Sequence, residues 1–74
     1  MSTKQAILFD TKKGWTERLS HEWLKEHRLI PIKPVHKTAN YLRYRLQEPD
    51  EKHYRYRIIN FGHGVHAVIG FRKD

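Results

Sequence analysis

Apolar and polar residues alternate along two stretches near the middle of the chain, a pattern typical of β-strands. Tyr-Leu-Arg-Tyr-Arg-Leu begins at residue 41, and Tyr-Arg-Tyr-Arg begins at residue 54. Residues 48–52 between them include Pro49 and Asp50, which favour a turn because proline presets φ and aspartate bonds its own backbone. The alternation therefore predicts an antiparallel hairpin with its turn centred on Asp50.

The alternation also sets the expected register of this hairpin. With the turn centred on Asp50, Tyr44 faces Tyr56 on one side of the sheet. The other side then carries four arginines in two cross-strand pairs, Arg43 with Arg57 and Arg45 with Arg55. A register shifted by one residue would pair tyrosines with arginines and mix the faces. Because like charges opposite each other are destabilising, we expect open water or a bound anion to offset their repulsion.

A helix is predicted from Thr16 to about Arg28, because apolar residues recur every four positions and form one stripe. The stripe consists of Trp15, Leu19, Trp23 and His27, with Leu24 beside it. Thr16 is a good N-cap, and Glu17 lies in the first turn, where the helix dipole favours a negative charge. We expect both tryptophans to pack in the core rather than to stack against bases.

Shorter signals predict the elements at the two ends of the chain. Residues 1–5 are polar and are expected to be disordered, whereas the apolar run of residues 6–10 is consistent with a strand buried on both sides or at a sheet edge. Gly62 and Gly64 flank a single residue and indicate a tight turn that needs positive φ. Residues 65–72 then alternate as a last strand, which would pair back on residues 53–61.

We therefore predict a single α+β domain over residues 1–74, with elements in the order β-α-β-β-β. One amphipathic helix would pack on one face of a mainly antiparallel sheet of three or four strands, in which the place of residues 6–10 is left open. The covered face is expected to hold Leu42, Tyr44, Leu46, Tyr54, Tyr56, Ile58, Val65, Ala67, Ile69 and Phe71. The open face is expected to hold Tyr41, Arg43, Arg45, Arg55, Arg57, His66 and Arg72.

The charge balance indicates that this fold carries a binding surface. Fifteen Lys and Arg residues against eight Asp and Glu residues give a formal net charge of +7, which raises the expectation of a polyanionic partner, nucleic acid first. The absence of Cys excludes disulfides and thiolate metal sites. No apolar run approaches the roughly 20 residues of a membrane span, and the N-terminus lacks the apolar region of a signal peptide. We expect an intracellular protein that is not secreted and has no membrane partner.

The first hypothesis is that the open face binds nucleic acid. Guanidinium groups match phosphate oxygens bidentately, and an aromatic side chain among them can stack on bases. The candidate residues are Arg43, Arg45, Arg55 and Arg57, with Arg72, Tyr41 and His66 at the margin. Lys37 is expected to extend this binding track. DNA is favoured over RNA. Two alternatives remain open: a solvated face whose arginine stems cover apolar surface, and an interface with an acidic protein surface, the chain being a monomer or a homodimer.

No catalytic arrangement is visible in the sequence. The only serines are Ser2 and Ser20, and the acidic residues fall mainly in the predicted helix and turn, so neither a nucleophile with its base nor a carboxylate pair is indicated. His63 and His66 have a spacing without fixed ligand geometry, and no carboxylate is placed beside them. We expect no enzyme activity, no metal and no cofactor.

Four segments together resemble a small module found in proteins of tailed bacteriophages and large DNA viruses. They are residues 22–27 (Glu-Trp-Leu-Lys-Glu-His), 40–45 (Asn-Tyr-Leu-Arg-Tyr-Arg), 56–57 (Tyr-Arg) and 62–70 (Gly-His-Gly-Val-His-Ala-Val-Ile-Gly). The match covers about residues 15–71, with Tyr56 where the module often has Phe and Val65 where it often has Ile. The resemblance implies a viral, genome-associated or virion protein, located inside the host cell or the virion, and assigns no residue a role.

Overall fold

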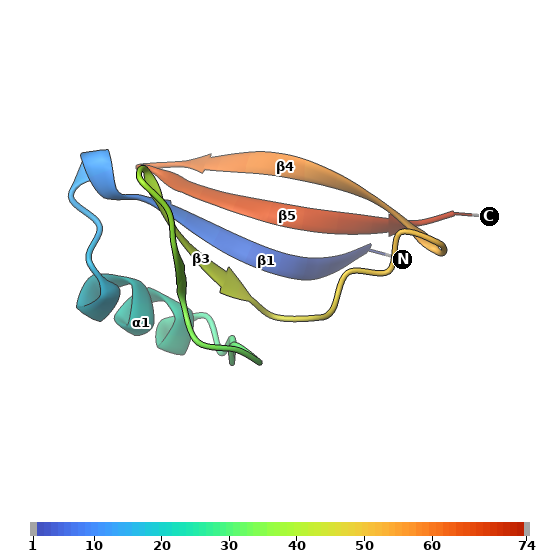
Figure 1. Ribbon diagram of the computed structural model, residues 1–74, viewed down its shortest axis with the longest axis horizontal. Coiled ribbons are helices and arrows are strands. Elements are labelled where there is room, and N and C mark those ends of the chain that lie inside the picture. The colour runs from blue at the N-terminus through green and yellow to red at the C-terminus, as the bar shows by residue number, and fades with distance from the viewer. Residues whose placement is uncertain (1, 74) are drawn as a thin grey trace.

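The computed structural model describes residues 2–73 as a five-stranded antiparallel sheet with one α-helix on one of its faces (Figure 1). The elements are β1 (Ser2–Asp10), the 3-10 turn η1 (Thr11–Lys13), α1 (Glu17–Glu26), β2 (His36–Lys37), β3 (Tyr41–Arg45), β4 (Tyr54–Gly62) and β5 (Val65–Arg72). The predicted α+β class is confirmed. The predicted count of three or four strands is wrong, because β2 adds a short strand at one edge. The strands are ordered β2-β3-β1-β5-β4. No helix in this part of the chain is long and apolar enough to span a bilayer.

The first strand of the chain is the central strand of the sheet. β1 pairs with β3 on one side and with β5 on the other, and Ala6, Ile7 and Phe9 have no exposed surface. An apolar run of this kind is what a strand buried on both faces needs. Residues 2–5, which were expected to be disordered, belong to the same strand, whereas Met1 lies outside the described residues.

The predicted hairpin of residues 41–57 does not form, because β1 and β5 lie between β3 and β4. Arg43 lies opposite Leu8 of β1 and His36 of β2. Arg57 lies opposite Ile69 of β5. The expected square of four arginines is therefore absent, and the repulsion that it would have caused is absent with it.

The segment between β3 and β4 crosses the end of the sheet instead of turning back on itself. Its first residues are tied to β1, since the N–H groups of Leu46 and Gln47 both donate to the Gln5 carbonyl oxygen (2.8 and 3.2 Å). The buried Gln5 side chain returns a hydrogen bond from Nε2 to the Gln47 carbonyl oxygen (2.9 Å). Pro49 and Asp50 thus belong to a crossover rather than to a hairpin turn.

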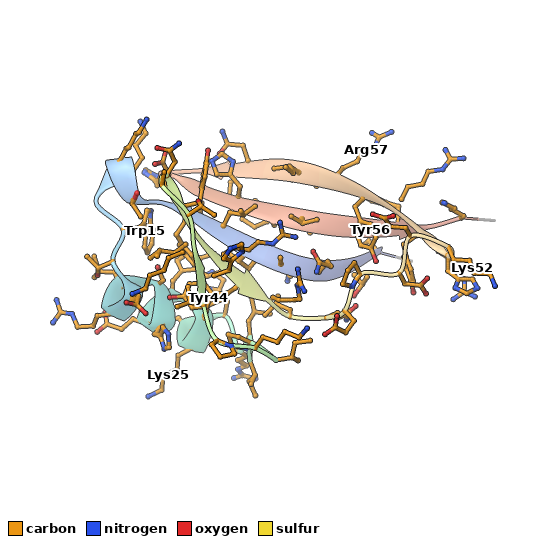
Figure 2. The ribbon with its side chains drawn as sticks, viewed as in Figure 1. Trp15, Lys25, Tyr44, Lys52, Tyr56 and Arg57 are labelled. Atoms are coloured by element: carbon orange, nitrogen blue, oxygen red, sulfur yellow. The ribbon has the colours of Figure 1, made fainter. Side chains whose placement is uncertain are left out.

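A β-bulge in β4 reverses the faces of that strand. An unbroken ladder continued from the Gly62–Val65 pair would set Tyr56 opposite Phe71, but the register shifts between Asn60 and Gly62, so Tyr56 pairs with Gly70 and Arg57 with Ile69. A one-residue shift sends every side chain of a strand to the opposite face. Tyr54, Tyr56 and Ile58 accordingly lie on the open face, and Arg55 and Arg57 lie on the face that carries the helix. Figure 2 shows Tyr56 and Arg57 pointing away from each other.

The core is an aromatic cluster around Phe9 that joins the helix to one end of the sheet. The Phe9 ring lies 4.8 Å from Trp15, 5.5 Å from Trp23 and 5.6 Å from Tyr44, measured between ring centroids. Contacts of this tilted and edge-to-face kind stabilise beyond the area they bury. The prediction that both tryptophans pack in the core is confirmed.

Local signals place the helix and the glycine turn. The Thr16 side chain caps α1 by accepting a hydrogen bond from the Leu19 N–H (3.2 Å), as expected. The helix ends at Glu26, two residues before the predicted limit, since Arg28 adopts a left-handed φ of 57°. His63 and Gly64 both have positive φ (55° and 80°), which the tight turn between β4 and β5 requires.

A glycine in β5 makes room for Tyr56 on the open face. A Cβ atom at Gly70 would lie 2.8 Å from Tyr56 Cε1 and 3.3 Å from Thr3 Cγ2. The Tyr56 hydroxyl oxygen reaches the crossover and accepts a hydrogen bond from the Asp50 N–H (2.7 Å). The absent side chain therefore lets one tyrosine connect β4 to the crossover.

We expect Gly70→Ala to displace the Tyr56 ring and lower the free energy of unfolding by about 1–3 kcal/mol. Tyr56→Phe, which removes only the acceptor, should cost about 1 kcal/mol. Urea unfolding of both single variants and the double variant measures the coupling. In the Gly70→Ala background the Tyr56→Phe change should cost less, because the hydroxyl has already moved from Asp50; equal costs in both backgrounds would contradict this.

Burial raises the pKa of the Tyr44 hydroxyl above its usual value, although the Ser20 hydroxyl offsets part of the rise. The folded protein therefore holds this proton more tightly than the unfolded chain does. The stability is intact below the unfolded pKa of about 10 and falls as the pH rises above it, since the unfolded state ionises first. Tyr44→Phe should remove this contribution and shift alkaline unfolding to higher pH. Urea unfolding of both proteins from about pH 8 to about pH 11, where tyrosine titrates, tests this prediction. The same pH dependence of the free energy of unfolding in the two proteins would contradict it.

Candidate nucleic-acid interface

Within residues 2–73, the arginines make no ion pair. The three ion pairs present are Lys33 with Glu48 (2.8 Å), Lys37 with Glu17 (2.8 Å) and His53 with Asp50 (2.9 Å). An arginine that no carboxylate neutralises keeps its full charge and its fork of donors for an external anion. The positive charge of the arginines is thus not neutralised by ion pairs among the described residues.

Lys37, which is predicted to extend the binding track of the open face, lies on the other side of the sheet. It pairs with Leu42 in the sheet register, a core residue on the helix side. Its Nζ is bound to the Glu17 carboxylate of α1, and this hydrogen bond raises the pKa of Lys37. Lys37 therefore ties β2 to the helix and does not extend the open face.

The predicted arginine plate is divided between the two faces of the sheet. Tyr41, Arg43 and Arg45 project from β3 on the open face, and His66 joins them from β5. The Tyr41 and His66 rings meet edge to face, with centroids 5.8 Å apart. Arg55 and Arg57 are absent from this face because the bulge in β4 reverses them.

Arg43 is only partly available on the open face. Its Nη2 donates to Gln5 Oε1 (3.3 Å), and its Nε is buried without a hydrogen-bond partner among the described residues. The side chain therefore lies along the sheet, and its stem covers apolar surface as arginine stems commonly do. Arg45 lies two residues farther along the same strand, beside the crossover, and contributes to lowering the pKa of Glu48, after the larger effect of Lys33.

The largest group of cationic side chains without an ion pair surrounds a hollow at the end of the sheet that lies away from α1, where β4 begins and β5 ends. The hollow lies on the face opposite to that of Tyr54 and Tyr56. This basic hollow has a volume of about 460 Å³ and is lined by Arg55, Arg57, Phe71, Arg72 and Lys73. None of the acidic residues within residues 2–73 lines it. The helix covers the other end of the sheet (Figure 1), so the hollow stays open to solvent.

The backbone register explains how these side chains meet. Arg55 lies directly opposite Phe71, and Arg57 lies opposite Ile69, so both arginines stand on the same face two residues apart. Arg72 lies opposite Tyr54 and extends from the end of β5. Lys73 donates from Nζ to the Glu51 carbonyl oxygen (2.6 Å), which anchors its stem beside the crossover.

Phe71 and Lys73 were missed by the sequence reasoning. Alternation placed Phe71 in the core, but the helix does not reach this end of the sheet and the ring is 40% exposed. Lys73 follows the last predicted strand residue. The signal that was available is the run Phe71-Arg72-Lys73 itself, in which an aromatic residue adjoins two cations.

A larger hollow lies along the helix and has a different character. Its volume is about 920 Å³, and Leu24, Leu29 and Pro31 line it together with residues of both charge signs, Glu17 and Arg18 among them. Mixed charges do not select for an anion, so this hollow is a weaker candidate for a phosphate site. Within residues 2–73 no group of three or more His, Cys, Asp or Glu side chains is placed to hold a metal ion.

Comparison of the chain with protein families, with curated proteins and with solved structures gives no match.

Proposed function

We propose that the protein binds single-stranded nucleic acid, without catalysing a reaction, and that the basic hollow is its main phosphate site. The observation that carries the proposal is the convergence of Arg55, Arg57, Arg72 and Lys73 on one hollow, which no acidic residue of the described part of the chain lines. Cations fixed on paired strands lose less side-chain entropy when they bind an anion than cations on a mobile loop do. Fork-shaped guanidinium groups are suited to phosphate oxygens.

The exposed aromatic ring in the hollow favours a single strand over a duplex. Phe71 stands between the cations, opposite Arg55. In proteins that bind single strands, aromatic rings stack on unpaired bases while cations follow the phosphates. Bases in a duplex are already stacked on one another and cannot use such a ring.

The other predicted residues take a secondary role in this proposal. Arg72 lies opposite Tyr54 in the register and also lines the basic hollow, so it stands where the two faces meet at the end of β5. Arg45 and Tyr41 on the open face would extend the bound strand beyond the hollow. DNA remains the favoured target, and a DNA virus or phage remains the proposed source, the latter on the resemblance of the sequence alone.

The double variant Arg55→Gln/Arg57→Gln tests the site. We expect it to weaken binding of a labelled oligothymidylate, and each lost phosphate contact should lower the slope of log K against log salt by about 0.7. Fluorescence anisotropy over a salt series gives both quantities. Arg18→Gln/Arg28→Gln, in and just after α1 at the other end of the sheet, changes the net charge equally and serves as the matched control.

Three outcomes would contradict the proposal. Equal losses in the two double variants would show a response to net charge rather than a site. A larger loss from Arg43→Gln/Arg45→Gln would move the site to the open face. No binding of DNA or RNA by the wild type at about 50 mM salt, where phosphate contacts are strong, would leave an acidic protein surface as the partner of these arginines.

Phe71→Leu tests stacking separately from charge. Leucine keeps an apolar side chain beside Arg55 but has no aromatic face, so single-strand affinity should fall by about 1–3 kcal/mol. Duplex binding should change little. Anisotropy with single-stranded and duplex forms of one sequence makes the comparison, and an equal loss for both forms would contradict stacking on Phe71.

A further inference from the structure

The two edges of the sheet differ in how they are protected. The β2 edge is only two residues long, carries Lys37 and follows Pro34, and such features discourage pairing with another chain. The β4 edge is nine residues long and is not covered by another described element (Figure 1). Its apolar side chains are exposed: 67% for Ile58, 48% for Phe61 and 38% for Ile59. A long edge strand with exposed apolar side chains and unpaired backbone groups can pair with a strand of another chain.

The hydrogen bonds at the start of β4 show which backbone groups point outward. The Lys73 N–H donates to the His53 carbonyl oxygen (2.8 Å), so these two residues form a hydrogen-bonded pair beside the paired Tyr54 and Arg72. Bonded and non-bonded pairs alternate along an antiparallel ladder. Residues 55, 57 and 59 therefore direct their backbone groups to β5, whereas those of Tyr56, Ile58 and Asn60 point away from the sheet.

We propose that β4 pairs with β4 of a second copy of this chain, antiparallel, about a two-fold axis at Ile58. In this register Ile58 lies opposite Ile58 of the second copy, and Tyr56 lies opposite its Asn60. All of these residues have outward backbone groups, so each pair can exchange both of its hydrogen bonds. The exposed apolar side chain at the centre meets its own counterpart, which removes it from water.

The charges of β4 select this register and a second copy as the partner. About Ile58, Arg57 lies opposite Ile59 of the second copy and Arg55 lies opposite its Phe61, so no arginine directly faces another. Centring the axis on Tyr56 would place Arg55 opposite Arg57 of the second copy, which is destabilising. Centring it on Asn60 would carry Tyr56 past the end of the partner strand. An axis at Ile59 would also keep the arginines apart, but it would pair only residues 56–62 of each strand. The axis at Ile58 pairs all nine residues of β4 with no arginine directly facing another, so this register is favoured.

In this dimer the basic hollows of the two copies lie on the same face of the continuous sheet. The two-fold axis of an antiparallel strand pair stands perpendicular to the sheet, so both hollows lie on the same face. The Arg57 residues of the two copies become diagonal neighbours, about 7–8 Å apart on that face. The dimer does not depend on nucleic-acid binding, but it would join two phosphate sites into one track.

Single-cysteine variants test the register directly, because the natural chain has no Cys. Across a hydrogen-bonded pair the Cα atoms are about 5.5 Å apart, within the range of about 4.4–6.8 Å that disulfides span. Ile58→Cys should therefore form a covalent dimer on mild oxidation. Asn60→Cys should not, because it lies opposite Tyr56 of the second copy, about 14 Å along the strand from its own counterpart at the strand rise of about 3.4 Å per residue. Ile30→Cys, 84% exposed in the wild type, controls for random collision.

Sedimentation of the wild type and of Ile58→Pro completes the experiment. Proline at position 58 removes an outward N–H and leaves the ladder to β5 intact, a place where an edge strand tolerates it. We expect a dimeric wild type, and a monomeric Ile58→Pro whose circular dichroism shows a folded sheet. Cross-linking of Asn60→Cys or Ile30→Cys as readily as Ile58→Cys would overturn the proposal, and so would a wild type that stays monomeric at high micromolar concentration.

Discussion

The packing of Phe9 among Trp15, Trp23 and Tyr44 is the contact on which the arrangement of this protein depends. It fastens the only α-helix of the described chain to the central strand, and it does so at one end of the sheet. In a chain this small there is one core, and its position decides which surfaces remain uncovered. Here the core protects β1, β3 and most of β5, and it leaves the end of β5 at Phe71 and Arg72 and most of β4 exposed.

That exposed region explains how one strand can present two different chemistries. On β4 the tyrosines turn toward Gly70 and the crossover, where Tyr56 has a structural hydrogen bond. The arginines turn to the opposite face, where no helix covers them and no carboxylate among residues 2–73 neutralises them. The same alternation that elsewhere separates core from solvent here separates a structural face from a cationic one.

The sequence was sufficient for features decided by neighbouring residues and insufficient for those decided at long range. The Thr16 cap, the tryptophan stripe and the glycine turn are local, and all three were predicted. Alternation assigns a residue to a face but does not say which strand lies beside it, so the crossover after β3 was mistaken for a hairpin. The bulge before Gly62 then moved Arg55 and Arg57 to the other face. No local signal distinguishes this register from the one beside it, because both place some apolar residues inward.

The central position of β1 has a kinetic consequence. Ile7 pairs with Tyr44 on one side and with Ala67 on the other, so β1 joins the sheet only through contacts between residues far apart in the chain. Topologies with such high contact order fold slowly, because a long loop must be ordered before the pairing stabilises it. During that interval the most apolar segment, Ala6 to Phe9, has neither of its neighbouring strands. A nascent chain would thus expose its future centre until β5 has been made, and it would depend on low concentration or a chaperone to remain unaggregated.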